Sequence, residues 1–152
     1  MELYDYGIIG GGPAGYTAGM MLANSGHSVV LFEKDKLGGT CLNRGCIPTK
    51  SFLHSSEVFA EIKSASKIGV EIEGMSFDFS KVVEKKDNVV EKIRKSLELA
   101  VKNSGVVVVN DEACVKEDCV ISTLSGEYKV GKIILATGSK PCLLYTSDAA
   151  DE

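Results

Sequence analysis

The first part of the chain alternates apolar runs with one glycine-rich segment and one helical pattern. Leu3–Ile9 is a short apolar run, and the segment GGGPAG follows it from Gly10. Small and apolar residues recur at helical spacing from Ala14 to about Asn24, and a second apolar run covers Ser28–Glu33. A strand, a glycine turn, a helix and a second strand within about thirty residues predict a βαβ unit with a right-handed crossover.

Two helical patterns occupy the middle of the chain. The first runs from about Pro48 to Ser64, and the second is a longer amphipathic pattern over Phe79–Lys102. The lysines and glutamates of the second pattern predict its solvent-facing side. We expect the following side chains to face inward from the two helices: Phe52, Leu53, Val58, Phe59, Ile62, Val82, Val83, Val89, Val90, Ile93, Leu97 and Leu99.

The remaining apolar runs predict strands. Val106–Val109 is typical of a buried strand, and Ala113–Ile134 contains short β-prone runs separated by KED, SGE and VGK turns. Ile133–Pro141 is predicted as a further strand that ends in a turn of small residues. Together these elements predict an α/β fold: a Rossmann-like domain with a parallel sheet, crossover helices and a small antiparallel β-meander.

The last eleven residues differ in character from the rest. The segment CLLYTSDAADE, from Cys142 to Glu152, shows neither turn chemistry nor helical periodicity. It resembles the in-frame translation of a sequencing-library adapter, so we expect it to be non-native and exclude it from the fold. On this interpretation the native part is residues 1–141, and the predicted domain is incomplete at its C-terminus.

Composition narrows the class of protein. The chain has 152 residues, 44% of them hydrophobic and 25% charged, which is ordinary for one globular domain. Its net charge of −4 gives no electrostatic basis for binding nucleic acid. No apolar run approaches the roughly 20 residues of a membrane span, and we expect neither a secretion signal nor a transit peptide. Five cysteines without a secretory context argue against a disulfide scaffold, so we expect a cytoplasmic enzyme or binding domain.

Three glycines lie between the first strand and the first helix with the spacing G-x-G-x-x-G. Gly10 permits the sharp turn, Gly12 leaves room for a pyrophosphate, and Gly15 allows the helix to pack closely on the strand. Free N–H groups at the helix N-terminus then face the diphosphate. Glu33 ends the second strand, where a carboxylate accepts hydrogen bonds from ribose and disfavours a 2′-phosphate. The pattern predicts an adenine dinucleotide site without deciding between FAD and NAD.

Cys41 and Cys46 lie behind a run of small residues, and four kinds of site are compatible with them. A zinc site needs about four ligands, but the only histidines are His27 and His54, for which we expect surface or packing roles. A structural disulfide is unusual in the cytosol, and inert buried thiols suit a Gly-Gly-Thr turn poorly. A redox pair is favoured, because a helix beginning after the loop stabilises a thiolate at Cys46. A short loop also makes a disulfide easier to reduce.

Four segments together resemble one family: GIIGGGPAGYTAG, LFEKDKLGGT, GGTCLNRGCIPTKSFLHSSE and ILATGSKP. They are similar to the dihydrolipoamide dehydrogenases of the pyridine nucleotide-disulfide oxidoreductase family over Leu3–Pro141. The resemblance implies that Cys46 is the flavin-proximal thiol of a charge-transfer complex and that Cys41 exchanges with substrate. It implies FAD as first cofactor, held by Gly10, Gly12, Gly15, Glu33, Gly39, Thr40, Lys50, Ala113, Thr137 and Gly138, with Lys50 near the flavin N5 edge.

The resemblance also implies a reaction and its partners. Dihydrolipoamide would reduce the Cys41–Cys46 disulfide, and the electrons would pass through FAD to NAD⁺. The partner would be the lipoyl domain of a 2-oxo-acid dehydrogenase complex or of the glycine cleavage system. Family members carry further domains for NAD binding and homodimerisation, and a His–Glu acid–base pair. None of these is recognisable in the sequence, so we expect the chain to be inactive alone.

Alternatives stay open within and outside this enzyme class. Glutathione and mercuric reductases share the family pattern, although CLN, CIP and FLHSS favour the lipoamide enzyme, and Arg44 stands where a small residue is commoner. A non-catalytic FAD-binding fragment is the alternative of a different class. Cys114 and Cys119 are expected to be packing thiols, and no metal site is predicted.

Overall fold

The structure is a computed structural model, and it describes residues 2–139. Its helices are α1 (Pro13–Asn24), α2 (Gly39–Asn43), α3 (Cys46–Ser64) and α4 (Phe79–Asn103). Its strands are β1 (Glu2–Ile9), β2 (Val29–Phe32), β3 (Val107–Val109), β4 (Cys114–Val115), β5 (Val120–Ser122) and β6 (Glu127–Leu135). The expectation of a non-native tail at Cys142–Glu152 concerns residues outside this range.

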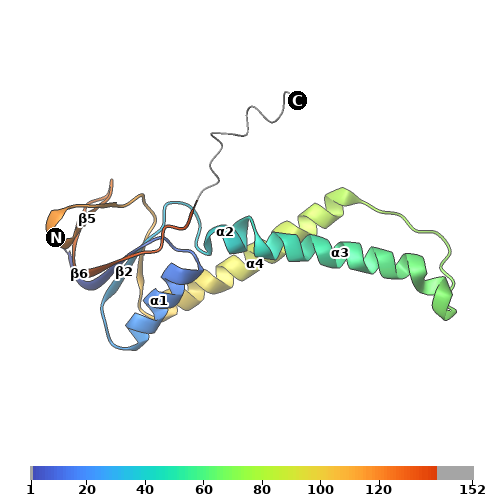
Figure 1. Ribbon diagram of the computed structural model, residues 1–152, viewed down its shortest axis with the longest axis horizontal. Helices are drawn as coiled ribbons and strands as arrows, with labels where there is room; N and C mark the ends of the chain where they lie inside the picture. The colour runs from blue at the N-terminus through green and yellow to red at the C-terminus, as the bar shows by residue number, and fades with distance from the viewer. Residues whose placement is uncertain (1, 140–152) are drawn as a thin grey trace, which may run out of the picture.

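A six-stranded sheet forms the centre of the fold, with the strand order β3-β2-β1-β6-β5-β4 (Figure 1). The strands β3, β2, β1 and β6 pair in parallel, whereas β4, β5 and β6 pair antiparallel. The predicted α/β fold, with its βαβ unit and its antiparallel meander, is therefore confirmed.

One strand is longer than the sequence pattern indicated. β6 is continuous, so the end of the meander and the strand expected from Ile133 are one element. Tyr128, near its start, pairs with Ile121 of β5, while nearly the whole strand pairs with β1. The turn expected at VGK was wrong, because Gly131 lies inside β6. Pairing with β1 keeps this segment extended despite its glycine.

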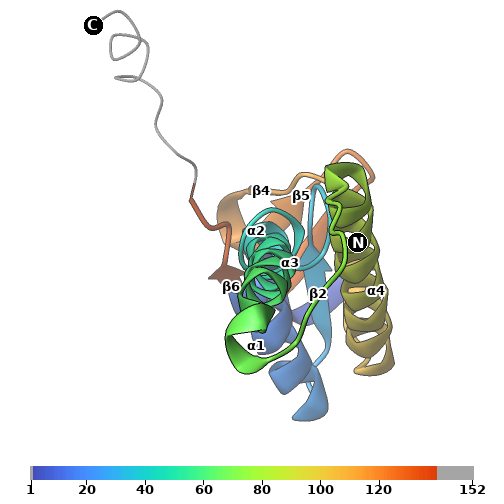
Figure 2. The same cartoon turned by 90° about the vertical axis from the view of Figure 1, so that its right-hand side faces the viewer.

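Apolar side chains pack on both faces of the sheet. Every residue of β2 is buried, as expected for a parallel strand that is covered on both sides. Ile8 and Leu31 pack with side chains of α1 and α4, and Figure 2 shows α4 alongside β2. Val30 and Phe32 face the other way and pack with residues of β5 and β6. Each such burial contributes roughly 1.5–3 kcal/mol, so β2 anchors both layers.

β3 lies at the edge of the sheet. The run Val106–Val109 was expected to form a buried strand, but only Val106 is buried, and Val107 is 42% exposed. Among the described strands β3 pairs only with β2, so its other edge is not covered by the sheet. An apolar run thus identifies a strand without fixing its position in the sheet.

α3 and α4 form an antiparallel hairpin that extends away from the sheet (Figure 1). Phe52 stacks on Phe79 with ring centroids 6.2 Å apart, and Phe59 packs edge-on against Phe77 at 5.5 Å. The first contact joins the two helices, and the second joins α3 to the segment just before α4. Within residues 2–139, no helix is both long enough and apolar enough to cross a membrane.

The expectation of inward-facing side chains was wrong for part of this hairpin. α3 has no buried residue, whereas Val90 and Val101 of α4 are buried. Periodicity finds the apolar side of a helix, but only part of α4 lies against the sheet. The side chains predicted inward but found exposed are Leu53, Val58, Ile62, Ile93 and Leu99.

The cysteines of the meander are also exposed, so their expected role as packing thiols was wrong. Cys114 lies on β4, the last strand in the sheet order, and Cys119 lies in the turn that follows. Outer strands and turns have fewer neighbours that can cover a side chain. His27 and His54 are both exposed, in line with the surface role considered for them.

A polar network joins β1 to the start of β2. The Asp5 carboxylate accepts hydrogen bonds from the backbone N–H and the hydroxyl of Ser28, at 2.8 and 2.9 Å. These hydrogen bonds hold the pKa of Asp5 below its ordinary value, and the charge of His27 acts weakly in the same direction. The network therefore stabilises the ionised form of Asp5.

Replacing Ser28 with alanine should lower the melting temperature more at about pH 7 than at about pH 3. A carboxyl with a lowered folded-state pKa adds stability above its unfolded-state pKa, and this stability is lost as the pH falls through the folded-state pKa. Thermal unfolding followed by circular dichroism across this range measures the effect. In an Asp5→Asn background the loss should become independent of pH, and a persistent pH dependence there would contradict the assignment.

Candidate dinucleotide and dithiol site

The glycine turn between β1 and α1 brings backbone segments into close contact. Gly10 has a φ of 108°, and a Cβ there would lie 2.2 Å from the carbonyl oxygen of Ala136. A Cβ on Gly15 would lie 1.8 Å from the carbonyl oxygen of Gly10. Gly10 therefore makes the sharp turn, and Gly15 lets α1 approach β1, which are the backbone roles predicted for them.

Gly12 differs from these two glycines because it borders open space. Within 4 Å, a Cβ there would meet only the Cα of Gly39, at 3.8 Å. Gly12 is the N-cap residue of α1, Pro13 is the first helical residue, and no side chain caps this helix end. The N–H groups of the first turn thus lie beside the space that Gly12 leaves, an arrangement suited to a phosphate.

Glu33 follows β2 and ties it to the glycine turn. Its Oε2 accepts a hydrogen bond from the Gly11 N–H at 2.8 Å, and its Oε1 accepts one from the Asp35 N–H at 2.9 Å. A carboxylate offers about four lone-pair sites, so capacity for ribose hydroxyls is left. Glu33 therefore both shapes the turn and borders the space beside it.

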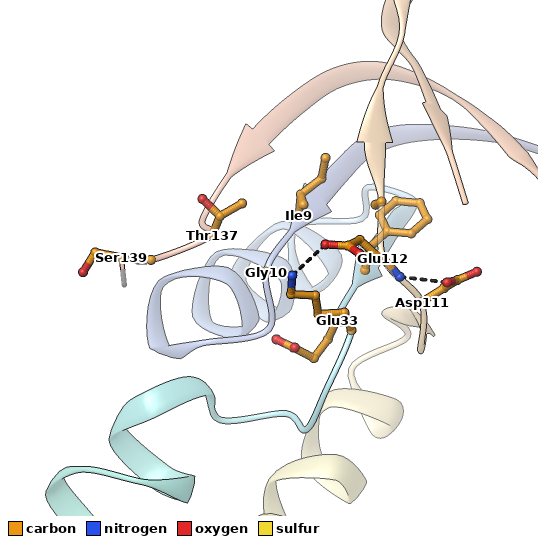
Figure 3. A pocket seen from close by; sticks show the side chains of 11 residues that line it. Ile9, Gly10, Glu33, Asp111, Glu112, Thr137 and Ser139 are labelled. Atoms are coloured by element: carbon orange, nitrogen blue, oxygen red, sulfur yellow. Dashed lines mark hydrogen bonds and ion pairs between the residues drawn. The ribbon is translucent and has the colours of Figure 1, made fainter. Parts of the chain in front are cut away.

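A cavity of about 350 Å³ opens where β1, β2 and β6 end (Figure 3). The predicted FAD contacts that line it are Gly10, Glu33, Ala113, Thr137 and Gly138. Sequence reasoning missed Lys34, Asp111 and Glu112, which also line it. The available signal was their place after β2 and β3, because ligands bind beyond the carboxyl ends of parallel strands.

The charged groups of this cavity interact with one another. Lys34 Nζ lies 2.6 Å from Glu112 Oε1, and this hydrogen bond raises the pKa of Lys34. Burial raises the pKa of Asp111, but hydrogen bonds from the N–H groups of Ser125 and Glu112 lower it overall. Three carboxylates, counting Glu33, against one lysine make the lining negative, which disfavours a 2′-phosphate.

A larger groove of about 840 Å³ connects the glycine turn to the first cysteine. A Cβ on Gly39 would lie 2.8 Å from the Cα of Gly12, so the start of α2 approaches the glycine turn closely. The groove brings together these predicted residues: Gly10, Gly12, Glu33, Gly39, Thr40, Cys41, Thr137 and Gly138. Four others lie outside its lining: buried Gly15, exposed Cys46 and Lys50, and Ala113, which lines the first cavity.

The two cysteines lie at the junction of α2 and α3. Cys41 is half-buried in α2, and Cys46 is the exposed first residue of α3. A hydrogen bond between the Cys41 and Cys46 side chains, burial and the electrostatic effect of Cys46 raise the pKa of Cys41. The Cys46 N–H and the Lys50 ammonium act in the opposite direction. Cys46 and burial therefore disfavour the thiolate form of Cys41.

Fold and site together define a class of protein. A parallel sheet with a glycine turn and an uncapped helix N-terminus is suited to a dinucleotide. Two neighbouring thiols, one of which lines the groove, can form and break a disulfide, which is two-electron chemistry. The class is that of dinucleotide-dependent disulfide oxidoreductases.

Comparison with known proteins gives the family. The model of the family "Pyridine nucleotide-disulphide oxidoreductase" matches residues 4–152, and the chain belongs to this family. Membership implies flavin and nicotinamide cofactors in general. The open space at Gly12 and the two cavities at the glycine turn fit such a dinucleotide.

Curated relatives carry the name dihydrolipoyl dehydrogenase. The protein of Acholeplasma laidlawii is 41% identical over 137 residues, which cover 90% of this chain and 41% of the relative. The protein of Chlamydia muridarum is 40% identical, over 92% of this chain and 31% of its own length. One from Bacillus subtilis is 36% identical, over 93% of this chain and 32% of its length. The chain thus spans well under half the length of these relatives.

A solved structure has the same fold. The Cu(II) complex of the HOCl-induced flavoprotein disulfide reductase RclA from Escherichia coli aligns with a TM-score of 0.73 and 28% identity. The alignment covers 90% of this chain and 28% of that chain. The structural neighbour is thus itself a flavoprotein disulfide reductase.

Gly12→Val should weaken FAD binding about tenfold or more, with little change in melting temperature. The side chain would project into the open space beside the α1 N-terminus, while the backbone at position 12 suits any residue. Quenching of FAD fluorescence and thermal unfolding measure the two effects.

Gly15→Ala is the matched comparison, because its Cβ would collide with Gly10 and should destabilise the fold itself. Unchanged FAD affinity in a folded Gly12→Val protein would contradict the assignment of the cradle.

Cys46→Ala should allow Cys41 to react with iodoacetamide at lower pH. Removing Cys46 removes the hydrogen bond and the electrostatic effect that raise the pKa of Cys41, so its thiolate forms earlier. Alkylation rates of reduced protein against pH, with the Cys41 peptide followed by mass spectrometry, measure the shift. The exposed Cys119 provides the internal reference. A Cys41 profile that does not move relative to Cys119 would show that the two thiols are not coupled.

Proposed function

We propose that the chain is the FAD-binding, disulfide-bearing part of a dihydrolipoamide dehydrogenase. The observation that carries the proposal is the groove that runs from the glycine turn to Cys41, whose thiol is hydrogen-bonded to Cys46. The names of the curated relatives support this enzyme over a glutathione or mercuric reductase. We assign NAD⁺ binding and homodimer formation to regions of such an enzyme outside these 152 residues.

The proposed FAD site divides between the two cavities. The N–H groups at the start of α1 bind the diphosphate beside Gly12, and Glu33 accepts hydrogen bonds from the ribose. Thr137 and Gly138 border both cavities, so they lie along the dinucleotide between its two ends. When bound, the flavin supplies a two-electron acceptor. The other residues proposed to hold it are Gly10, Gly15, Gly39, Thr40, Lys50 and Ala113.

The dithiol step uses only residues of this chain. A thiolate of dihydrolipoamide attacks Cys41 Sγ, which breaks the Cys41–Cys46 bond and leaves a mixed disulfide with a thiolate on Cys46. The second thiolate of the substrate then attacks the substrate sulfur that is bonded to Cys41. This step closes the lipoamide ring and releases Cys41. Two electrons move from substrate to the cysteine pair, and Cys41 takes up a proton.

The proposed partner is a lipoyl group on a carrier domain of a 2-oxo-acid dehydrogenase complex or of the glycine cleavage system. Cys46 is exposed and Cys41 is half-buried at the end of the groove, so a flexible arm could reach the pair from solvent. We propose a cytoplasmic location for this activity.

The oxidised chain should convert dihydrolipoamide to lipoamide with a yield of about one per chain. Cys41→Ser and Cys46→Ser should both abolish the yield, because a disulfide needs both sulfurs. Cys119→Ser, which changes an exposed cysteine outside the site, should keep the yield of the wild type. Lipoamide quantified by chromatography after anaerobic mixing checks these outcomes.

Two results would refute the proposed function. One is a folded wild-type chain that does not bind FAD. The other is a faster reduction of the Cys41–Cys46 disulfide by glutathione than by dihydrolipoamide at equal thiol concentration. That result would favour a glutathione reductase.

A further inference from the structure

Asn43 lies at the end of α2, between the two cysteines in the sequence, and its side-chain amide contacts the backbone at and just before the start of that helix. Its Nδ2 donates hydrogen bonds to the carbonyl oxygens of Leu37 and Gly39, each at 3.0 Å, with a longer contact of 3.4 Å to Lys36 O. An amide nitrogen carries two hydrogens, so these contacts use its donor capacity completely. The side chain thus bridges from α2 back to residues 36–39.

The other end of this side chain is unpaired. Asn43 Oδ1 is buried and has no hydrogen-bond partner among the described residues. The opposite orientation of the amide would point this oxygen at three carbonyl oxygens, which repel it. An unpaired buried acceptor is unfavourable, so the donated hydrogen bonds must outweigh its cost. They are therefore the contribution of the Asn43 side chain to this part of the fold.

The bridged segment is itself fixed to the glycine turn and to the core. The Gly38 N–H donates to the carbonyl oxygen of Gly11 at 2.8 Å, and the Leu37 side chain is buried. α2 has only five residues, too few to be stable as an isolated helix. Its position must therefore come from contacts such as the Asn43 bridge.

We propose that Asn43 is a positioning residue for the Cys41–Cys46 pair, an inference that rests on the proposed function. The bridge holds the end of α2 against the carbonyl oxygens of Lys36 and Leu37, and so fixes Cys41 in α2 relative to Cys46 at the start of α3. A fixed neighbour raises the effective concentration of one thiol at the other and favours closure of the disulfide. The reaction measured is reduced pair plus glutathione disulfide giving the protein disulfide plus two glutathiones, a transfer of two electrons.

Two variants of the full chain test this role. Asn43→Asp has nearly the same shape but replaces the donor with an oxygen that faces three carbonyl oxygens. Asn43→Ala removes the donor and the unpaired oxygen together, so it keeps the proposal testable if the aspartate variant does not fold. Asn88→Asp makes the same charge change at an exposed position on α4 and is the matched control.

The measurement is the equilibrium constant of the cysteine pair with glutathione. Alkylation followed by mass spectrometry gives it, on protein that circular dichroism shows to be folded. We expect it to fall about tenfold or more in both Asn43 variants and to stay within about twofold in Asn88→Asp. A lower melting temperature with an unchanged equilibrium constant would show a merely structural role and overturn the inference. In that case the wild-type pair still closes and the proposed function stands. A wild-type pair that stays reduced at every glutathione ratio would overturn both.

Discussion

The absence of side chains where α1 meets β1 is the constraint on which the site depends. The backbone of Gly15 touches the carbonyl of Gly10, and that of Gly10 touches Ala136 after β6. Any Cβ at these contacts would push α1 away from the sheet. The start of α1 forms one wall of the groove, and the start of α2 forms another, where Gly39 approaches Gly12. The groove therefore has its shape because four glycines let the backbone segments meet.

These backbone contacts explain why much of the site could be predicted from the sequence. Glycine spacing reflects a local steric requirement that does not depend on distant residues, and the continuous apolar run of β2 correctly indicated a strand covered on both faces. The position of β3 at the edge and the fusion of β6 with the meander depend on pairing between segments far apart in the chain. Lys34 and Glu112 are hydrogen-bonded although they lie 78 positions apart in the sequence. No local pattern could therefore predict their contact.

The cysteine pair shows a similar division between local and tertiary information. The spacing of Cys41 and Cys46 behind small residues was enough to predict a redox pair. The sequence did not reveal that Cys41 lines the groove while Cys46 lies outside its lining, or that Cys46 and burial raise the pKa of Cys41. The role of Asn43 was missed as well, because its partners are backbone carbonyls and any residue can supply those. A local motif thus identifies the cysteines, whereas tertiary packing determines the pKa of Cys41 and the position of the two side chains.

β6 belongs both to the parallel sheet and to the meander, and this has a consequence for local opening. The loop before β4 carries Asp111 and Ala113, and the loop after β6 carries Thr137 and Gly138. A fluctuation that detaches β6 from β1 also removes the support of β5 and β4, so both loops lose their positions in one event. Amide hydrogens of β6 and β5 should then exchange with solvent as one cooperative unit. Adenosine bound between these loops would slow that exchange across the whole meander, including strands that it does not touch.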